Sequence, residues 1–112
     1  MITKNYRNET VNENPHGMDV RKIYDNPVAQ IMHMTLKPGE SLKPHKTPVD
    51  AVFYVLEGKP TIHIDGESIA QDKDTLIESP ANIPHHISNE SEETARILVI
   101  KAPRPENKSK LL

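Results

Sequence analysis

Apolar and polar residues alternate along several short segments of the chain, and this pattern predicts strands rather than helices. Within residues 28–36, Met32, Met34 and Leu36 alternate with more polar neighbours. Because strand side chains point alternately to the two faces of a sheet, these three residues share one face, which we expect to line a core or cavity. His33 lies on the opposite, polar face, where a surface or subunit-contact role is expected.

Other segments rich in β-branched and aromatic residues, bounded by turn formers, predict further strands. They cover residues 20–24, 52–56, 61–65, 68–70, 75–78 and 95–101. The segments 52–56 and 61–65 are expected to pair as a hairpin, and Asp65 with Gly66 marks the next tight turn. No helix longer than one or two turns is predicted, so the expected fold class is all-β.

The composition is typical of a small sandwich or barrel. Ten prolines and four glycines in 112 residues favour many short strands joined by turns. The length suffices for a single domain with one core, which we place at residues 17–103. Residues 1–16 are polar and are expected to form a flexible arm, and residues 104–112 a frayed tail.

Charge and cysteine content argue against several classes of function. The chain has 14 Lys and Arg against 16 Asp and Glu, a net charge of −2, so neither a nucleic acid nor a membrane surface is an expected partner. It has no cysteine, which excludes thiolate chemistry and fits a cytoplasmic location. No apolar run has the length of a signal core or a membrane span. Ser68 and Ser79 have no neighbouring His and acid pattern, so a serine nucleophile is not supported.

One stretch, residues 39–58, combines turn signals, a histidine and an apolar strand. Its Gly39, His45 and Gly58 are spaced as in the first sequence motif of the cupin superfamily, which the stretch resembles. Thr47 and Ala51 stand at the two positions where that motif has a second His and a Glu. The resemblance therefore indicates the fold clearly, whereas its metal-binding positions are only partly kept.

A second stretch, residues 74–89, resembles the second cupin motif. Pro80, His85 and Asn89 fall in step with it, while Asn82 and Asp74 stand where the family has glycine. Asn and Asp tolerate the left-handed backbone better than most residues, so both replacements are mild. Over residues 28–103 the resemblance implies a small single-domain cupin β-barrel, or jelly roll, that pairs as a homodimer.

The resemblance also implies that His45 and His85 lie side by side on the inner wall of the barrel. In the family, these positions bind a divalent metal ion, here Fe, Mn, Ni, Zn or Cu. Thr47 is at best a weak ligand, Ala51 is none, and Asp50 points away by alternation. Two alternatives stay open: a metal-free pocket with hydrogen-bonded histidines, or an ion completed by water or a ligand carboxylate.

The family pattern and strand alternation together predict an apolar ligand pocket with the two histidines at its polar end. Its expected lining is Met32, Met34, Leu42, Thr47, Phe53, Val55, Ile87, Ile97 and Val99. His16, in the polar arm, is expected to be incidental.

The leading hypothesis for function is a cupin that binds a small molecule. A metal-dependent enzyme, of oxygenase or isomerase type and acting on a small organic acid or phenolic compound, is the first alternative. A metal-free enzyme with a histidine general base is the second.

Overall fold

The computed structural model describes residues 1–106 and 109–112, and these residues form mainly strands and turns. The strands are β1 (Asp19–Asn26), β2 (Ala29–Leu36), β3 (His45–Lys46), β4 (Ala51–Glu57), β5 (Thr61–Ile64), β6 (Glu67–Ala70), β7 (Leu76–Ser79), β8 (His85–Ser88), β9 (Ala95–Lys101) and β10 (Lys110–Leu111). The helical content of the described residues is a single 3-10 turn, η1 (Tyr6–Asn8). The predicted all-β class is confirmed.

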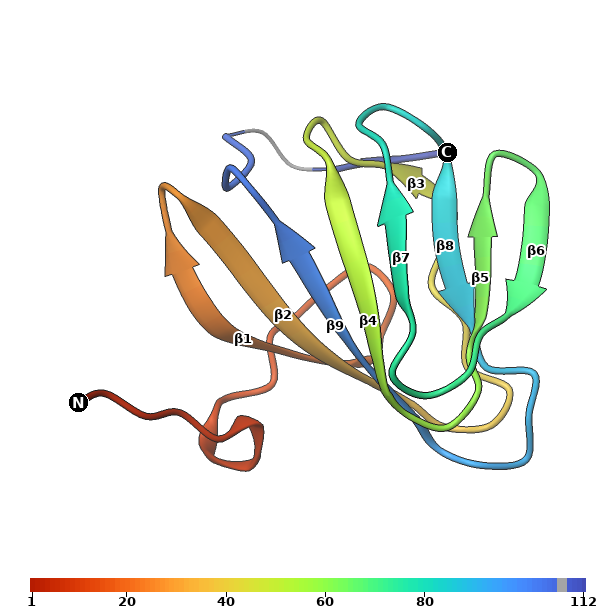
Figure 1. Ribbon diagram of the computed structural model, residues 1–112, viewed down its shortest axis with the longest axis horizontal. Coiled ribbons are helices and arrows are strands. Elements are labelled where there is room, and N and C mark those ends of the chain that lie inside the picture. The colour runs from red at the N-terminus through yellow and green to blue at the C-terminus, as the bar shows by residue number, and fades with distance from the viewer. Residues whose placement is uncertain (107–108) are drawn as a thin grey trace.

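Two antiparallel five-stranded sheets make up the molecule (Figure 1). The strand order is β1-β2-β9-β4-β7 in one sheet and β10-β3-β8-β5-β6 in the other. Phe53 and Ile97 of the first sheet and Ile62 and Ile87 of the second belong to one buried cluster. The sheets therefore pack face to face as a jelly roll, held together by the apolar residues that alternate inward.

The predicted alternation in β2 is confirmed. Leu36 is fully buried, while Met32 and Met34 are partly buried and pack against the core. These two methionines lie toward the end of the sheet interface where the histidine pair is found. The strand therefore passes from the core at one end to a more open cavity at the other.

The predicted hairpin between residues 52–56 and 61–65 is wrong. β4 pairs with β7 and β9, whereas β5 pairs with β6 and β8. The turn at Gly58 instead carries the chain from one sheet to the other. Gly58 has φ +76°, and a Cβ there would lie 2.5 Å from the carbonyl oxygen of Thr94, so the crossover requires glycine. The predicted turn at Asp65 and Gly66 is confirmed, and both residues have positive φ, as a tight hairpin turn requires.

Three short strands, β3, β8 and β10, were not expected from the sequence. β3 lies between Pro44 and Pro48 in a segment without a β-branched run, and β8 lies within the second motif. They pair with each other at His45 and His85. β10 in turn pairs with β3, so residues 110–111 lie beside the site. The mobility expected of residues 104–112 stays a prediction.

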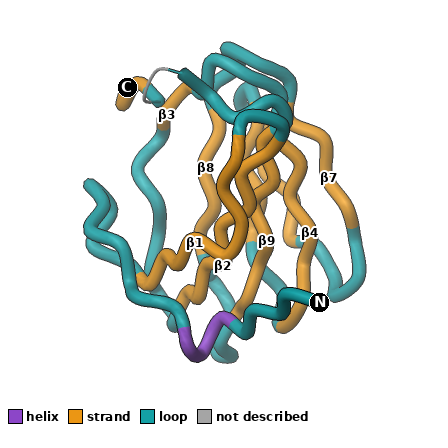
Figure 2. The backbone as a smooth tube through the Cα atoms, turned by 90° about the vertical axis from the view of Figure 1, so that its left-hand side faces the viewer, coloured by secondary structure: helices purple, strands orange, loops and turns teal. Residues whose placement is uncertain are grey.

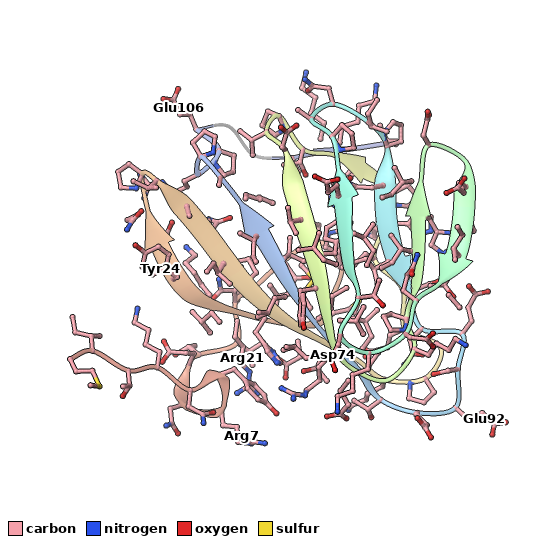
Figure 3. All side chains as sticks on the ribbon, in the orientation of Figure 1. Arg7, Arg21, Tyr24, Asp74, Glu92 and Glu106 are labelled. Atoms are coloured by element: carbon pink, nitrogen blue, oxygen red, sulfur yellow. The ribbon has the colours of Figure 1, made fainter. Side chains whose placement is uncertain are left out.

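His33 is not a surface residue, which corrects the expectation. Only 2% of it is exposed, because the ring of Tyr6 stacks on it with centroids 3.8 Å apart. Arg21 donates a hydrogen bond of 3.0 Å to the carbonyl oxygen of Tyr6, and Figure 3 shows Arg7 and Arg21 on either side of this 3-10 turn. The N-terminal arm thus covers the outer face of the first sheet, while the flexibility expected of residues 1–16 stays a prediction.

None of the helical residues in the described part of the chain forms a segment able to span a membrane. The cytoplasmic location and the homodimer stay predictions.

β1 lies at the edge of its sheet, where Val11 forms only an isolated bridge to Arg21.

Candidate functional site

His45 of β3 and His85 of β8 lie side by side between the two sheets. Strand pairing places them directly opposite each other, and their Nε2 atoms are 3.1 Å apart. The two rings meet edge to face, with centroids 4.6 Å apart. The rings of Phe53 and His85 also meet edge to face, with centroids 5.4 Å apart. The site is therefore a polar pair set against an apolar wall.

Hydrogen bonds define the proton positions of this pair. His45 Nδ1 lies 2.8 Å from the carbonyl oxygen of Lys43, which can only accept, so Nδ1 carries the proton and Nε2 has a lone pair. The His85 Nε2–H then donates to His45 Nε2 and, at 3.1 Å, to Thr47 Oγ1. His85 Nδ1 in turn accepts from the Ser79 hydroxyl at 2.6 Å. Two neutral imidazoles satisfy every one of these contacts.

Burial keeps both imidazoles neutral at pH 7. Burial is the main cause that lowers the pKa of His85 to about 4, and the neighbouring His45, Lys101 and His86 contribute to the same shift. Burial also lowers the pKa of His45, opposed by the hydrogen bond to the Lys43 carbonyl and assisted by Lys101. The pair is therefore an uncharged, internally hydrogen-bonded unit at pH 7.

Among the described residues, the chain supplies only two of the three protein ligands that a catalytic metal ion ordinarily has. Two imidazole nitrogens that share an ion at about 2.0–2.1 Å lie roughly 3 Å apart, and the observed 3.1 Å meets this condition. The third position, however, offers only the Thr47 hydroxyl, and Ala51 offers no donor. No group of three His, Cys, Asp or Glu side chains converges among residues 1–106 and 109–112. Catalytic sites for such ions use three protein ligands, one more than this pair supplies.

A cleft of about 420 Å³ opens beside the histidine pair. Its floor comes from β2, β3 and β9, and its rim from the two terminal segments. The lining residues are Glu13, Asn14, Pro15, His16, Val20, Gln30, Met32, Met34, His45, Lys101, Pro105, Glu106, Ser109 and Leu111. Figure 2 shows β3 with the C-terminal end on one side and β1 with β2 on the other. A small cavity of about 30 Å³ continues inward, lined by both His45 and His85.

The predicted pocket residues divide into three groups. Met32 and Met34 line the cleft. Leu42, Phe53, Ile87 and Val99 line the small inner cavity together with Met34. Thr47 is buried against His85, whereas Val55 and Ile97 are fully buried in the core. Whether a ligand occupies this space stays a prediction.

Three residues at the site were not expected from the sequence. Lys101 lines both the cleft and the inner cavity. Its position could have been predicted, because Ala95, Ile97 and Val99 alternate inward and Lys101 is the next residue in that series. The ring of His16, expected to be incidental, lies 5.3 Å from that of His45. Ser109 lies 3.1 Å from Thr47 Oγ1 through its hydroxyl. His16 and Ser109 come from terminal segments whose position no local pattern indicates.

A larger hollow of about 780 Å³ shares Pro105 and Glu106 with the cleft. It is lined by Asp25, Pro27, Pro48, Val49, Pro103, Arg104, Pro105 and Glu106. No imidazole is among these residues. The cleft combines imidazoles with apolar side chains and is the better candidate for a site.

A two-sheet jelly roll with a histidine pair on its inner wall defines a protein of the cupin class. The sequence profile described as the Cupin domain matches residues 32–101. The chain belongs to the cupin domain family, and the predicted family is confirmed. Asp74 and Asn82, at family glycine positions, have φ of 67° and 62°, so they adopt the left-handed backbone expected there.

Similar proteins have been described in several bacteria. The tetracenomycin polyketide synthase protein TcmJ of Streptomyces glaucescens is 32% identical over 78 residues, which are 66% of this chain and 52% of that protein. This chain therefore matches about half the length of that relative.

Solved structures share the fold over almost the whole chain. TT1209 of Thermus thermophilus is 29% identical with a TM-score of 0.80, covering 94% of this chain and 100% of that one. The polyketide cyclase RemF of Streptomyces resistomycificus is 19% identical with a TM-score of 0.85, covering 100% of this chain and 85% of that one. At this level of identity the RemF likeness concerns the fold alone.

Proposed function

We propose that this cupin binds a small, largely apolar organic molecule in the cleft, with the His45–His85 pair as the polar end. The observation that carries the proposal is the cleft of about 420 Å³ that leads to the pair. This volume lies within the usual range for small-molecule sites, which combine apolar walls with a few placed polar groups. Met32 and Met34 supply adaptable apolar surface that suits a planar or flexible ligand.

The name of one relative supports a polyketide-like ligand. That relative is a tetracenomycin polyketide synthase protein. Molecules of this kind present large apolar surfaces edged by carbonyl and hydroxyl groups. Such a group would replace the hydrogen bond between the two histidines, either by donating to His45 Nε2 or by accepting from His85 Nε2–H.

A metal-dependent enzyme acting on a small organic acid or phenolic compound is the second candidate. The separation of 3.1 Å between the two Nε2 atoms favours it, because two ligands of one ion have this spacing. It requires a divalent ion, such as Fe, Mn, Ni, Zn or Cu. Thr47 and Ala51 cannot complete the coordination of that ion by themselves, so it would need further ligands. It differs from the first candidate in a measurable property, the metal content of the purified protein.

Titration with a fluorescent neutral probe, 1-naphthalenemethanol, tests the first candidate. The chain has no tryptophan, so naphthyl emission is free of overlap. We expect saturable binding that weakens by roughly 3- to 10-fold in Met32→Gln, since part of an apolar contact of about 1–2 kcal/mol is lost. Leu76→Gln, the same kind of change at an exposed position outside the cleft, is expected to leave the affinity unchanged.

Two outcomes would contradict the proposal. One is a linear, unsaturable fluorescence change up to the solubility limit of the probe. The other is equal weakening by Met32→Gln and Leu76→Gln. Circular dichroism of both variants verifies that each keeps its strands.

A further inference from the structure

Lys101 is the charged residue at the floor of the cleft. In β9, Ala95, Ile97 and Val99 alternate inward and are buried, and Lys101 is the next residue in this series. It is half-buried and lines both the cleft and the inner cavity. The chain therefore points an ammonium group into a space that is otherwise lined largely by apolar side chains and imidazoles.

The cross-strand neighbours of Lys101 carry no negative charge. Strand pairing places Gln30 of β2 and Ala51 of β4 beside it. Across residues 1–106 and 109–112, the hydrogen bonds and ion pairs of the structure include none made by its Nζ atom. Lys22 and Lys59, in contrast, pair with Asp25 and Asp72 at 3.3 and 3.4 Å.

The imidazoles around the cleft do not compensate this charge either. His16, His45 and His85 are neutral at pH 7, because burial lowers the pKa of each and the Lys101 ammonium lowers it further. Burial also lowers the pKa of Lys101 itself. A buried cation without a counter-charge is unfavourable, so an anion that reached it would be bound with a gain in free energy.

Two carboxylates line the cleft, but at its rim. Glu13 and Glu106 are exposed, and Figure 3 shows Glu106 pointing away from the sheets. Charges in water interact with an effective dielectric constant of about 80 and are screened over about 8 Å by physiological salt. The half-buried ammonium acts through a lower dielectric, so its attraction outweighs the repulsion from the rim.

We infer that the ligand of this cleft is an organic anion whose carboxylate or enolate pairs with Lys101 while its apolar body lies on Met32 and Met34. The amide of Gln30, opposite Lys101 in the sheet and also lining the cleft, supplies a second donor to the anionic group. The inference rests on the proposed function, because it names the chemical class that the same cleft selects. It makes Lys101 the residue that determines this specificity.

The test compares two probes of equal size, 1-naphthoate and 1-naphthalenemethanol, at pH 7.5. We expect 1-naphthoate to bind roughly 10- to 100-fold more tightly, the range of a charge-assisted hydrogen bond. Lys101→Met removes the ammonium but keeps length and apolar contact, so naphthoate should fall to the affinity of the neutral probe. Lys101→Arg is expected to restore most of the preference.

Lys73→Met is the matched control, because it changes the net charge equally at an exposed turn. It should leave both affinities unchanged. Equal binding of the two probes by the parent protein, or a preference that survives Lys101→Met, would overturn the inference while leaving the proposed function intact. If neither probe binds saturably, the proposed function itself fails.

Discussion

At the scale of single residues, two positions determine whether the site can hold a metal ion. A metal-binding cupin has ligands at these positions, whereas this chain has Thr47 and Ala51. Thr47 is 1% exposed and accepts a hydrogen bond from His85, and Ala51 is equally buried beside Ser79 and Lys101 in the sheet. Thr47 contacts the histidine pair directly, and the resemblance to the first cupin motif implies that Ala51 faces the pair as well. What is missing for an ion is donor atoms rather than a suitable place.

Replacing these two residues together should create a metal site. We expect Thr47→His with Ala51→Glu to bind one equivalent of Zn²⁺ tightly, because an imidazole and a carboxylate then join the nitrogens of His45 and His85. Isothermal titration calorimetry of the double variant and of the parent protein measures the gain. A polar group at buried Ala51 lowers stability, so the folded fraction is checked before titration.

Thr47→His alone is the control, and it should bind Zn²⁺ more weakly than the double variant because it lacks the carboxylate. A double variant with no gain over the parent protein would show that the four positions do not converge on one point. The assignment of Thr47 and Ala51 to ligand positions would then be wrong.

At the scale of elements, an aromatic contact adds to the hydrogen bonds that hold the N-terminal arm on the sheet. Tyr6 stacks on His33, with an interplanar angle of 9°, and the guanidinium of Arg96 lies 4.9 Å from the Tyr6 ring centroid. Arg96 also donates a hydrogen bond of 3.0 Å to His33 Nε2. The ring therefore covers a histidine that would otherwise meet water on the outer face of β2.

Removing this ring should lower the free energy of unfolding by roughly 1–2 kcal/mol, the range of a stacked aromatic pair with an added cation–π contact. Urea denaturation of Tyr6→Ala against the parent protein measures the loss. Tyr6→Phe keeps the ring and should stay close to the parent. If Tyr6→Ala unfolds at the parent's urea midpoint, the arm does not stabilise the sheet.

The strands of the core can be predicted from the sequence, but their partners cannot. β4 and β9 consist of β-branched and apolar residues, so local propensity identifies them. β3 and β8 are short and mostly polar, and their partners lie far away in sequence: β3 pairs with β8 and β10, and β8 also pairs with β5. The crossover at Gly58 has the same turn signal as a hairpin, and only the packing of two sheets distinguishes the two.

At the scale of the whole molecule, several buried histidines make stability depend on pH. Burial, as the main cause, lowers the pKa of His16, His33 and His85 from 6.5 to about 4. Between these values the unfolded chain binds more protons than the folded one. The free energy of unfolding therefore decreases as pH falls from about 6.5 toward 4, and these groups contribute no pH dependence above that range.

Urea midpoints measured at pH 8, 7, 6 and 5 test this dependence. We expect little change between pH 8 and 7 and a progressive decrease below about 6.5. His33→Gln, which removes one such group, should make the decrease less steep. A midpoint that stays constant or rises between pH 6.5 and 5 would contradict the burial of these imidazoles.

Only some of the residues at the candidate site could be predicted from the sequence. The resemblance to the two cupin motifs implies that His45 and His85 meet. Alternation in β9 could have located Lys101, but the sequence prediction did not include it. His16 and Ser109 lie far from these residues along the chain, and they reach the cleft only through the docking of terminal segments. Such placement follows from tertiary packing, for which a single sequence carries no periodic signal.

The floor and the rim of the cleft differ in how well they tolerate amino-acid substitutions. Its floor belongs to paired strands that share the core, whereas residues 13–16, 105–106 and 109–111 at its rim take little part in that core. Substitutions at the rim can thus alter which molecules enter without a large loss of folding free energy. A laboratory selection for binding of a new ligand should therefore randomise these rim positions and keep the strands of the cleft floor unchanged.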